Sequence, residues 1–158
     1  LPMRPAASPV RQIPPERTGD AVGGEGPALR ILLVEDSEDN QVLIRTFLNK
    51  TPHRLTVVVN GQEAVRIVQE EPFDLVFMDV QMPVMDGYTA TRRIRQWELE
   101  RERARQPLPI VALTAHALNG EEERSREAGC DLYLSKPIKK QRLLEVIQQM
   151  GKESGARR

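Results

Sequence analysis

Short apolar runs and helical patterns alternate along most of the chain. Five mainly apolar runs, each followed by a polar or charged side chain, lie at residues 31–34, 55–59, 75–78, 109–113 and 132–134. Each run is followed by a segment of helical pattern, and these segments begin near Ser37, Asn60, Asp86, Asn119 and, for the last, before Leu143. Continuous apolar runs are typical of strands that are buried on both faces of a parallel sheet. The pattern therefore predicts an α/β fold with an open, doubly wound sheet of five parallel strands and five helices, because an eight-fold barrel needs more units.

The first 29 residues differ in composition from the rest. They hold six of the twelve prolines and four of the ten glycines, and their apolar residues follow no period. Such a segment cannot bury enough apolar surface to offset the entropy that is lost on ordering. We therefore expect a disordered linker over residues 1–29, one folded domain over residues 30–150, and a flexible tail over residues 151–158, where the apolar periodicity stops.

Charge and cysteine content exclude several classes of protein. Lys and Arg together number 23, as do Asp and Glu, so the formal net charge is zero, which argues against nucleic-acid binding driven by overall charge. The single cysteine, Cys130, excludes an intramolecular disulfide and a zinc site made of cysteines alone. No apolar run approaches the roughly 20 residues of a membrane helix. We expect a soluble, cytoplasmic protein that is a monomer or a weak dimer.

Carboxylate, hydroxyl or ammonium side chains follow four of the five predicted strands. They are Glu35 and Asp36 after the first strand, Asp79 after the third, Thr114 after the fourth and Lys136 after the fifth. In open α/β sheets, ligands bind outside the carboxyl ends of the strands, so we expect these side chains to meet at one rim. Three neighbouring carboxylates need a cation or a proton to offset their repulsion. Oxygen ligands without His or Cys favour a hard ion, Mg²⁺ or Mn²⁺, and Lys136 and Thr114 could bind an anion held on it.

Four stretches, in the same order as in a known family, carry a resemblance. They are LLVED at residues 32–36, VFMDVQMPVMDG at 76–87, ALTA at 112–115 and YLSKP at 133–137. With these stretches, residues 30–150 resemble the receiver domain of two-component response regulators, and look most like the receivers of hybrid sensor histidine kinases. The resemblance covers about three-quarters of the chain. It implies a flavodoxin-like fold with strand order 2-1-3-4-5.

The resemblance implies a role for each acidic side chain at the rim. Asp79 would be the phosphoacceptor, which attacks the phosphorus of a phosphohistidine. Asp36 and Asp79 would bind Mg²⁺ directly, together with the backbone carbonyl of Gln81, and Glu35 would act mainly through metal-bound water. These roles agree with the chemistry of phosphoryl transfer, which requires positioning and charge stabilisation more than covalent help from additional groups.

The resemblance also implies which residues bind the phosphoryl group and respond to it. Thr114 and Lys136 would bind phosphoryl oxygens, with a cis Lys136-Pro137 peptide bond directing the ammonium group. Phosphorylation would draw Thr114 toward the phosphoryl group, and Tyr133 would fill the vacated space. Gln81 and His116, which lie two residues after the phosphoacceptor and two after the threonine, would tune the lifetime of the acyl phosphate.

The leading hypothesis is a receiver that accepts a phosphoryl group from a histidine kinase or a histidine phosphotransfer domain and switches a protein-interaction surface. It would catalyse its own phosphorylation and the hydrolysis of its acyl phosphate without being a conventional enzyme. It would act either as the C-terminal receiver of a hybrid kinase or as a stand-alone regulator without an output domain.

Two alternative functions compete with this hypothesis. One is a Mg²⁺-dependent phosphatase or phosphotransferase, which commonly has the second acid that Asp79-Val80-Gln81 lacks. The other is an interaction scaffold, which would not need the intact set of polar side chains at the rim. No Gly-x-x-x-x-Gly-Lys phosphate loop occurs.

Overall fold

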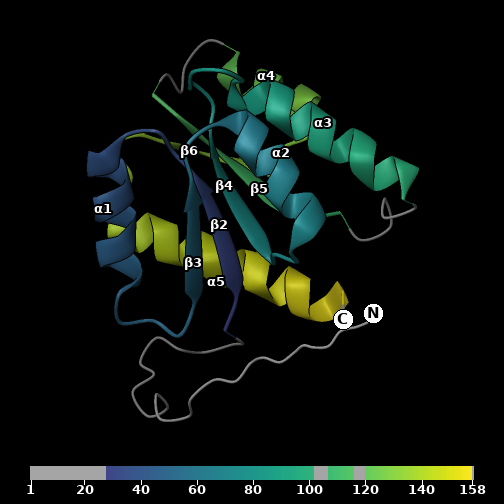
Figure 1. Ribbon diagram of the computed structural model, residues 1–158. Helices are drawn as coiled ribbons and strands as arrows, with labels where there is room; N and C mark the ends of the chain where they lie inside the picture. Colours follow the sequence, from purple (N-terminus) through teal and green to yellow (C-terminus); the bar gives the residue numbers. More distant parts are fainter. Residues whose placement is uncertain (1–27, 102–106, 116–119, 158) are drawn as a thin grey trace.

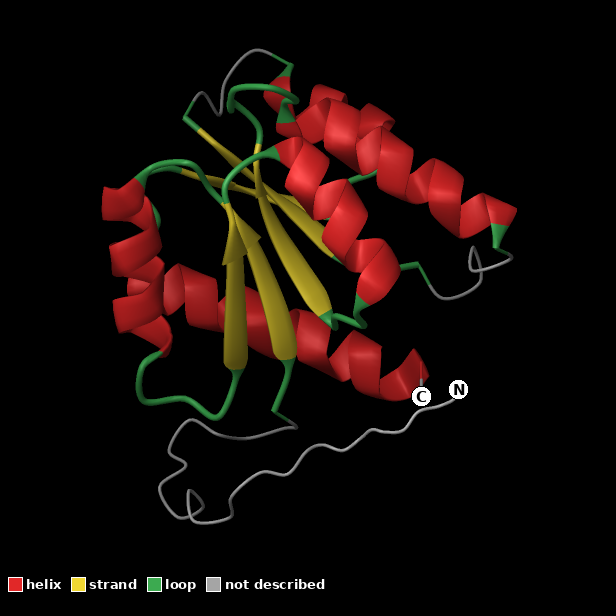
Figure 2. Ribbon diagram, in the orientation of Figure 1, coloured by secondary structure: helices red, strands yellow, loops and turns green. Residues whose placement is uncertain are grey.

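Five parallel strands form one sheet in the computed structural model, which describes residues 28–101, 107–115 and 120–157 (Figure 1, Figure 2). The strands are β2 (Arg30–Val34), β3 (Arg54–Val58), β4 (Leu75–Asp79), β5 (Ile110–Thr114) and β6 (Leu132–Ser135). They lie in the order β3-β2-β4-β5-β6, which is order 2-1-3-4-5 along the chain, so the predicted fold class is confirmed. The helices are α1 (Glu38–Leu48), α2 (Gly61–Glu70), α3 (Gly87–Glu100), α4 (Glu121–Ala128) and α5 (Lys140–Arg157).

The alternation of side chains along the strands divides the core into two layers. Ile31 and Leu33 of β2 pack with the apolar stripes of α1 and α5, on one face of the sheet (Figure 1). Leu32 and Val34 pack with α2 and α3 on the other face. All four are fully buried, as expected for a parallel sheet between two layers of helices. With both faces covered, polar side chains can reach solvent at the ends of the strands.

Three helices begin with a side-chain cap near the carboxyl edge of the sheet. The side chains of Ser37, Asn60 and Asp86 each accept a hydrogen bond from the backbone N–H three residues later. At α2 the cap resembles a capping box, except that Glu63 accepts from the N–H of Val59 and not from that of Asn60. These caps fix where α1, α2 and α3 start relative to the rim.

Two predicted boundaries do not coincide with the structure. Helix α5 continues to Arg157, whereas its apolar stripe predicted an end near Met150 and a flexible tail over residues 151–158. Gly151 is buried and lies against Leu29, so the helix packs beyond the stripe. Most of the predicted linker, residues 1–27, lies outside the described residues, but Leu29 is part of the core. Within the described part of the chain, no helix combines the length and the apolar character needed to cross a bilayer.

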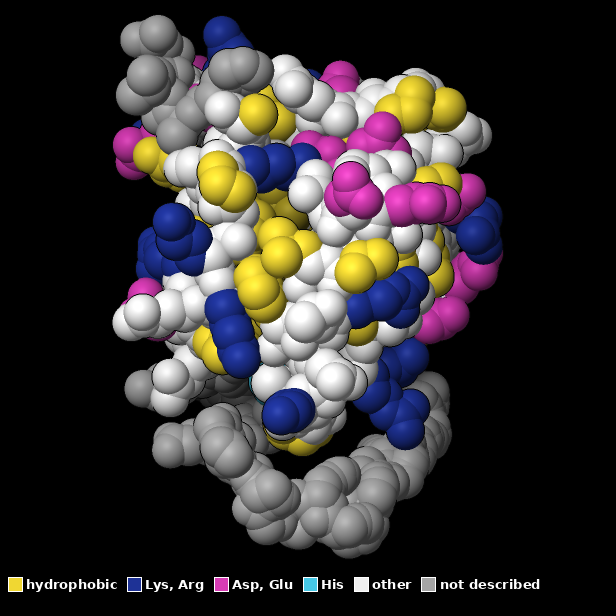
Figure 3. Space-filling view, turned by 90° about the vertical axis from the view of Figure 1, so that its left-hand side faces the viewer, with side chains coloured by type: hydrophobic (Ala, Val, Ile, Leu, Met, Phe, Trp, Pro, Cys, Tyr) yellow, Lys and Arg dark blue, Asp and Glu magenta, His cyan; other side chains and the backbone are white. Residues whose placement is uncertain are grey.

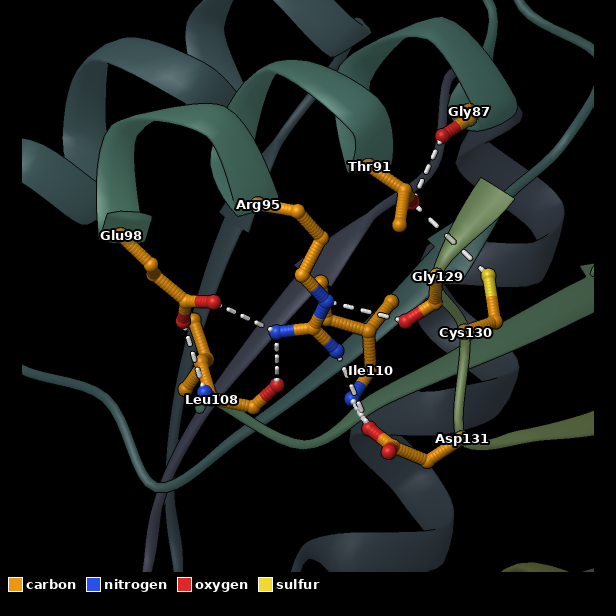
Figure 4. A network of polar contacts seen from close by, with 9 residues as sticks. All are labelled: Gly87, Thr91, Arg95, Glu98, Leu108, Ile110, Gly129, Cys130 and Asp131. Carbon is orange, nitrogen blue, oxygen red and sulfur yellow. Dashed lines mark hydrogen bonds and ion pairs between the residues drawn. The ribbon is translucent and has the colours of Figure 1, made fainter. Parts of the chain in front are cut away.

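A polar network joins α3 to the amino ends of β5 and β6 (Figure 4). The guanidinium group of Arg95 donates to the carbonyl oxygens of Leu108 and Gly129 and to the carboxylates of Glu98 and Asp131. Glu98 is buried and also accepts from the N–H of Leu108 at 2.7 Å. Because the network lies at the end of the sheet opposite the rim, we interpret it as a structural connection between helix α3 and the two loops that precede β5 and β6.

Candidate functional site

Three carboxylates from two strand ends meet at the carboxyl edge of the sheet. Glu35 and Asp36 follow β2, and Asp79 is the last residue of the neighbouring strand β4. One carboxylate oxygen of each residue lies within 4.8 Å of the other two. Glu35 and Asp79 are buried, with 1% and 3% of their surface exposed, whereas Asp36 is exposed. The predicted acidic cluster is therefore present, with one of its three members open to solvent.

The ammonium group of Lys136 lies between two of these carboxylates. Its Nζ atom is 3.2 Å from Glu35 Oε1 and 3.2 Å from Asp79 Oδ1. The backbone N–H of Lys136 donates to the carbonyl oxygen of Thr114 at 2.8 Å, and the Lys136-Pro137 peptide bond is cis, as predicted. One lysine therefore offsets part of the negative charge and connects the ends of three strands.

Burial makes the negative charge of Asp79 unfavourable. The pKa of Asp79 is raised from 3.8 to about 6, with burial as the largest cause and the neighbouring Glu35 carboxylate acting in the same direction. Lys136 and the N–H of Gln81, which donates to Asp79 Oδ1 at 3.2 Å, act in the opposite direction. The cluster is thus short of positive charge. Its oxygen-only donor set fits a hard divalent cation such as Mg²⁺.

The first turn of α1 holds Glu35 in place. Oε2 of Glu35 accepts from the N–H of Ser37 at 3.2 Å and from Asn40 Nδ2 at 3.3 Å. The backbone carbonyl of Glu35 accepts from Gln41 Nε2 at 2.8 Å. The sequence pattern did not point to Asn40 or Gln41. Their positions could have indicated this contact, because residues three and four places after the Ser37 cap are its near neighbours on the helix surface.

The other predicted site residues that the structure describes lie on β5 and β6 or in the turn after β4. Thr114 is buried at the end of β5. Gln81 is exposed in the turn after β4. Tyr133 is half-buried on β6, in register with Ala112 of β5. His116 lies outside the described residues. The structure therefore brings Thr114 and Gln81 to the acidic cluster through backbone contacts and places Tyr133 on the adjoining strand.

A hydrogen-bonded contact joins α4 to the helix that follows Asp79. The hydroxyl group of Tyr88 on α3 donates to the carboxylate of Glu121 and lies 3.2 Å from Ser125 Oγ. Glu121 and Ser125 are buried, and Ala128 is the one buried apolar side chain of α4. Burial raises the pKa of Tyr88 to about 12, which keeps its hydroxyl protonated as a donor. The sequence did not indicate this contact, because it joins two residues that are 33 positions apart in the chain.

We expect Tyr88→Phe to loosen α4. The substitution removes a donor from the buried Glu121 carboxylate, which costs about 1–3 kcal/mol. Native-state hydrogen exchange of the α4 amides should therefore become faster. Glu122→Gln is a matched control on the same helix, because the Glu122–Arg126 ion pair is exposed and contributes little to stability. Exchange in Tyr88→Phe as slow as in the wild-type protein would show that the contact does not anchor α4.

Comparison with known proteins identifies the family. A family model of the response regulator receiver domain matches residues 31–148. The chain belongs to the response regulator receiver family. The resemblance seen in the four sequence stretches is thereby confirmed.

The receiver is similar to parts of sensor kinases and to solved receivers. It is 49% identical over 120 residues to the sensor histidine kinase GacS of Pseudomonas protegens, covering 76% of this chain but 13% of that protein. It is 40% identical to the solved receiver domain of the Pseudomonas aeruginosa sensor histidine kinase PA1611, which has magnesium coordinated in its active-site cleft (TM-score 0.70, covering 80% of this chain and 99% of that chain). It also matches, at 35% identity, the co-crystal structure of the Saccharomyces cerevisiae histidine phosphotransfer protein Ypd1 with the receiver domain of Ssk1 (TM-score 0.76, covering 80% of this chain and 91% of that chain). The receiver thus spans a small part of the length of GacS.

Proposed function

We propose that this receiver accepts a phosphoryl group from phosphohistidine onto Asp79 in a Mg²⁺-dependent step, and that the acyl phosphate switches a protein-interaction surface. The observation that carries the proposal is the environment of Asp79. Its buried carboxylate has a pKa raised to about 6, lies 3.2 Å from Lys136 Nζ and shares a cluster with two further carboxylates. Membership of the receiver family and the similarity to sensor kinases support the same function.

The proposed transfer uses Asp79 as the nucleophile. A bond forms between a carboxylate oxygen of Asp79 and phosphorus while the phosphorus–nitrogen bond breaks, and the imidazole keeps the electron pair of that bond. The ionised form of Asp79 predominates above pH 6, so the nucleophile is available at neutral pH. Lys136, already 3.2 Å from Asp79 Oδ1, can bind one phosphoryl oxygen, and the Thr114 hydroxyl can donate to another. Positioning and charge stabilisation of this kind account for most of the catalysis of phosphoryl transfer.

The ligands that we propose for the cation are Asp36, Asp79 and the backbone carbonyl of Gln81, with Glu35 contacting the ion through water. Asp36 is the exposed member of the cluster and therefore the one an incoming ion would meet first. We propose Mg²⁺ rather than Mn²⁺, because magnesium is the ion in the related receiver PA1611. When bound, the ion would neutralise charge on the phosphoryl oxygens.

We propose that Thr114 and Tyr133 transmit the phosphorylation signal. Both lie on adjoining strands, Thr114 buried and Tyr133 half-buried, so a shift of one changes the packing available to the other. We propose further that Gln81 and His116 set the lifetime of the acyl phosphate. Gln81 supports this idea by its position, since it is exposed and its N–H contacts the phosphoacceptor.

The phosphoryl donor that we propose is a histidine kinase or a histidine phosphotransfer domain. In the related yeast complex, a receiver is solved together with a histidine phosphotransfer protein. Figure 3 shows the side of the molecule that carries α1 and the edge strand β3, where hydrophobic side chains reach the surface among basic ones. Val42 on α1 is 60% exposed and Val59 after β3 is 43% exposed. Exposed apolar groups near the rim support a protein partner, since such groups are buried at interfaces.

The wider organisation of the protein is also a proposal. Composition supports a linker that ends before Leu29, which belongs to the core, followed by a receiver that includes the whole of α5, either as part of a hybrid kinase or as a stand-alone regulator. A formal net charge of zero favours a protein over a nucleic acid as partner. We propose that the receiver acts in the cytoplasm, where it would meet its phosphohistidine donor. We propose further that it is a monomer or a weak dimer.

The mass of the intact protein after incubation with a small acyl-phosphate donor tests the proposal. We expect one added phosphoryl group that is lost when Mg²⁺ is chelated and absent from Asp79→Asn. Steady release of phosphate without an adduct would favour a phosphatase instead. Neither adduct nor turnover would indicate a receiver used as an interaction scaffold.

A further inference from the structure

Glu35 accepts hydrogen bonds from side chains at the start of α1 that do not take part in capping this helix. The cap is complete with Ser37, whose Oγ accepts from the backbone N–H of Asn40 at 3.3 Å. The side chains of Asn40 and Gln41 are not needed for this cap, and both donate to Glu35 instead. We propose that Asn40 and Gln41 are positioning residues that act through Glu35 to keep its carboxylate against Lys136; this inference rests on the proposed function of the site.

Every polar atom of Glu35 has a neighbour in this arrangement. Its N–H donates to the carbonyl oxygen of Val58 at 3.0 Å, and its own carbonyl accepts from Gln41. Oε2 accepts from the first turn of α1, at distances of 3.2 Å and 3.3 Å. Oε1 is left to face Lys136 Nζ at 3.2 Å. Glu35 is 1% exposed, and its two carboxylate oxygens have different partners: Oε2 accepts hydrogen bonds from Ser37 and Asn40, and Oε1 faces Lys136.

The amide side chains suit this task because they are neutral. A cation in place of Asn40 would draw Glu35 away from Lys136, and a carboxylate there would repel it, since charges a few ångströms apart interact by several kcal/mol near a protein surface. An amide donates a hydrogen bond without changing the charge of the cluster. Fixing Glu35 in turn fixes the ammonium group, which stays 3.2 Å from Asp79 Oδ1. Removal of a group that orients a metal ligand in this way typically lowers metal affinity or activity 10- to 100-fold.

The affinity of the unphosphorylated protein for Mg²⁺, measured by titration calorimetry, provides the first test. We expect Asn40→Ala to weaken binding about tenfold and to slow formation of the phosphoryl adduct at saturating Mg²⁺. Asn49→Ala is the matched control, because Asn49 is an exposed residue of the same type at the other end of the same helix. Thermal unfolding without Mg²⁺ separates a local effect from loss of the fold. Equal Mg²⁺ affinity in Asn40→Ala and Asn49→Ala would overturn the proposal.

A double-variant comparison tests whether Asn40 acts through Glu35. In the Glu35→Gln background, we expect Asn40→Ala to change the Mg²⁺ affinity no further, because the group it positions has been altered. The same tenfold loss in both backgrounds would show that Asn40 acts by another route and would overturn the proposal.

The side-chain carboxyl carbon resonance of Glu35, recorded without Mg²⁺ or phosphoryl donor, separates this inference from the proposed function. We expect it to shift in Asn40→Ala and in Gln41→Ala but not in Asn49→Ala. An unchanged resonance in Asn40→Ala would overturn the positioning role even if phosphorylation proceeds normally. Failure of the wild-type protein to form an adduct, with the resonance shifted as expected, would contradict the proposed function and leave the positioning of Glu35 in place.

Discussion

Asp79→Asn is expected to be more stable than the wild-type protein at pH 7 in the absence of Mg²⁺. The pKa of Asp79 is raised from 3.8 to about 6, mainly by burial and by the Glu35 carboxylate, so the ionised side chain destabilises the folded state. Each pKa unit corresponds to about 1.4 kcal/mol, which makes about 3 kcal/mol the upper limit of the effect. Asparagine keeps Oδ1 as an acceptor for Lys136 and for the N–H of Gln81 while removing the charge. Chemical denaturation of the two proteins measures the difference.

The difference in stability between Asp79→Asn and the wild-type protein is expected to depend on pH. Between about pH 4 and pH 6, the folded wild-type protein binds more protons at Asp79 than the unfolded chain does. Its stability therefore falls as the pH rises through this range and the contribution is constant above it. The advantage of Asp79→Asn should accordingly be small near pH 4 and reach its full size above pH 6. A difference that is absent at pH 7, or that does not change with pH, would contradict the unfavourable ionisation of Asp79.

Gly87→Ala is expected to destabilise the protein by about 3 kcal/mol and to disturb the phosphoacceptor. A Cβ atom at Gly87 would overlap the backbone carbonyl oxygen of Asp79 and lie 2.9 Å from Met78 Cγ. Only a glycine lets the first turn of α3 approach the end of β4 this closely, and its N–H also donates to the carbonyl oxygen of Val80 at 3.2 Å. The added methyl group must therefore push α3 or the phosphoacceptor out of place. Thermal and chemical unfolding measure the loss of stability.

Gly120→Ala is the matched control for Gly87→Ala. Gly120 has a φ of 85°, and a Cβ atom there would meet nothing within 4 Å. Its substitution should cost about 1–2 kcal/mol, the strain of a left-handed residue with a side chain, and should leave the acidic cluster intact. If Gly87→Ala proved no more harmful than Gly120→Ala, the close approach of α3 to Asp79 would not be a constraint on the fold.

The positions of the strands were predictable because a continuous apolar run indicates a strand that is buried on both faces, whereas the strand order was implied by the family resemblance. Each observed strand begins and ends within one residue of the predicted run, as in the run at 75–78 and strand β4 (Leu75–Asp79). The meeting of Glu35, Asp79 and Lys136 followed from one rule, that parallel strands end at the same edge of a sheet. Neither inference required knowledge of side-chain conformations.

The contacts that the sequence did not reveal depend on how helices lie against one another. Tyr88 reaches Glu121 only because α3 and α4 pack side by side, and no local pattern encodes that distance. The support of Glu35 by Asn40 depends on side-chain conformation in the first turn of α1. The extension of α5 past Met150 has a similar cause, because it depends on tertiary packing of Gly151 and not on apolar periodicity.

Borohydride reduction of the phosphorylated protein tests the central claim most directly. Borohydride cleaves an aspartyl phosphate and converts that residue to homoserine, which peptide mass mapping can locate. The proposed function predicts conversion at Asp79 after incubation with a small acyl-phosphate donor and Mg²⁺, and no conversion when either is left out. Conversion at Asp36, or a phosphoryl group carried by another residue while Asp79 is unmodified, would contradict it.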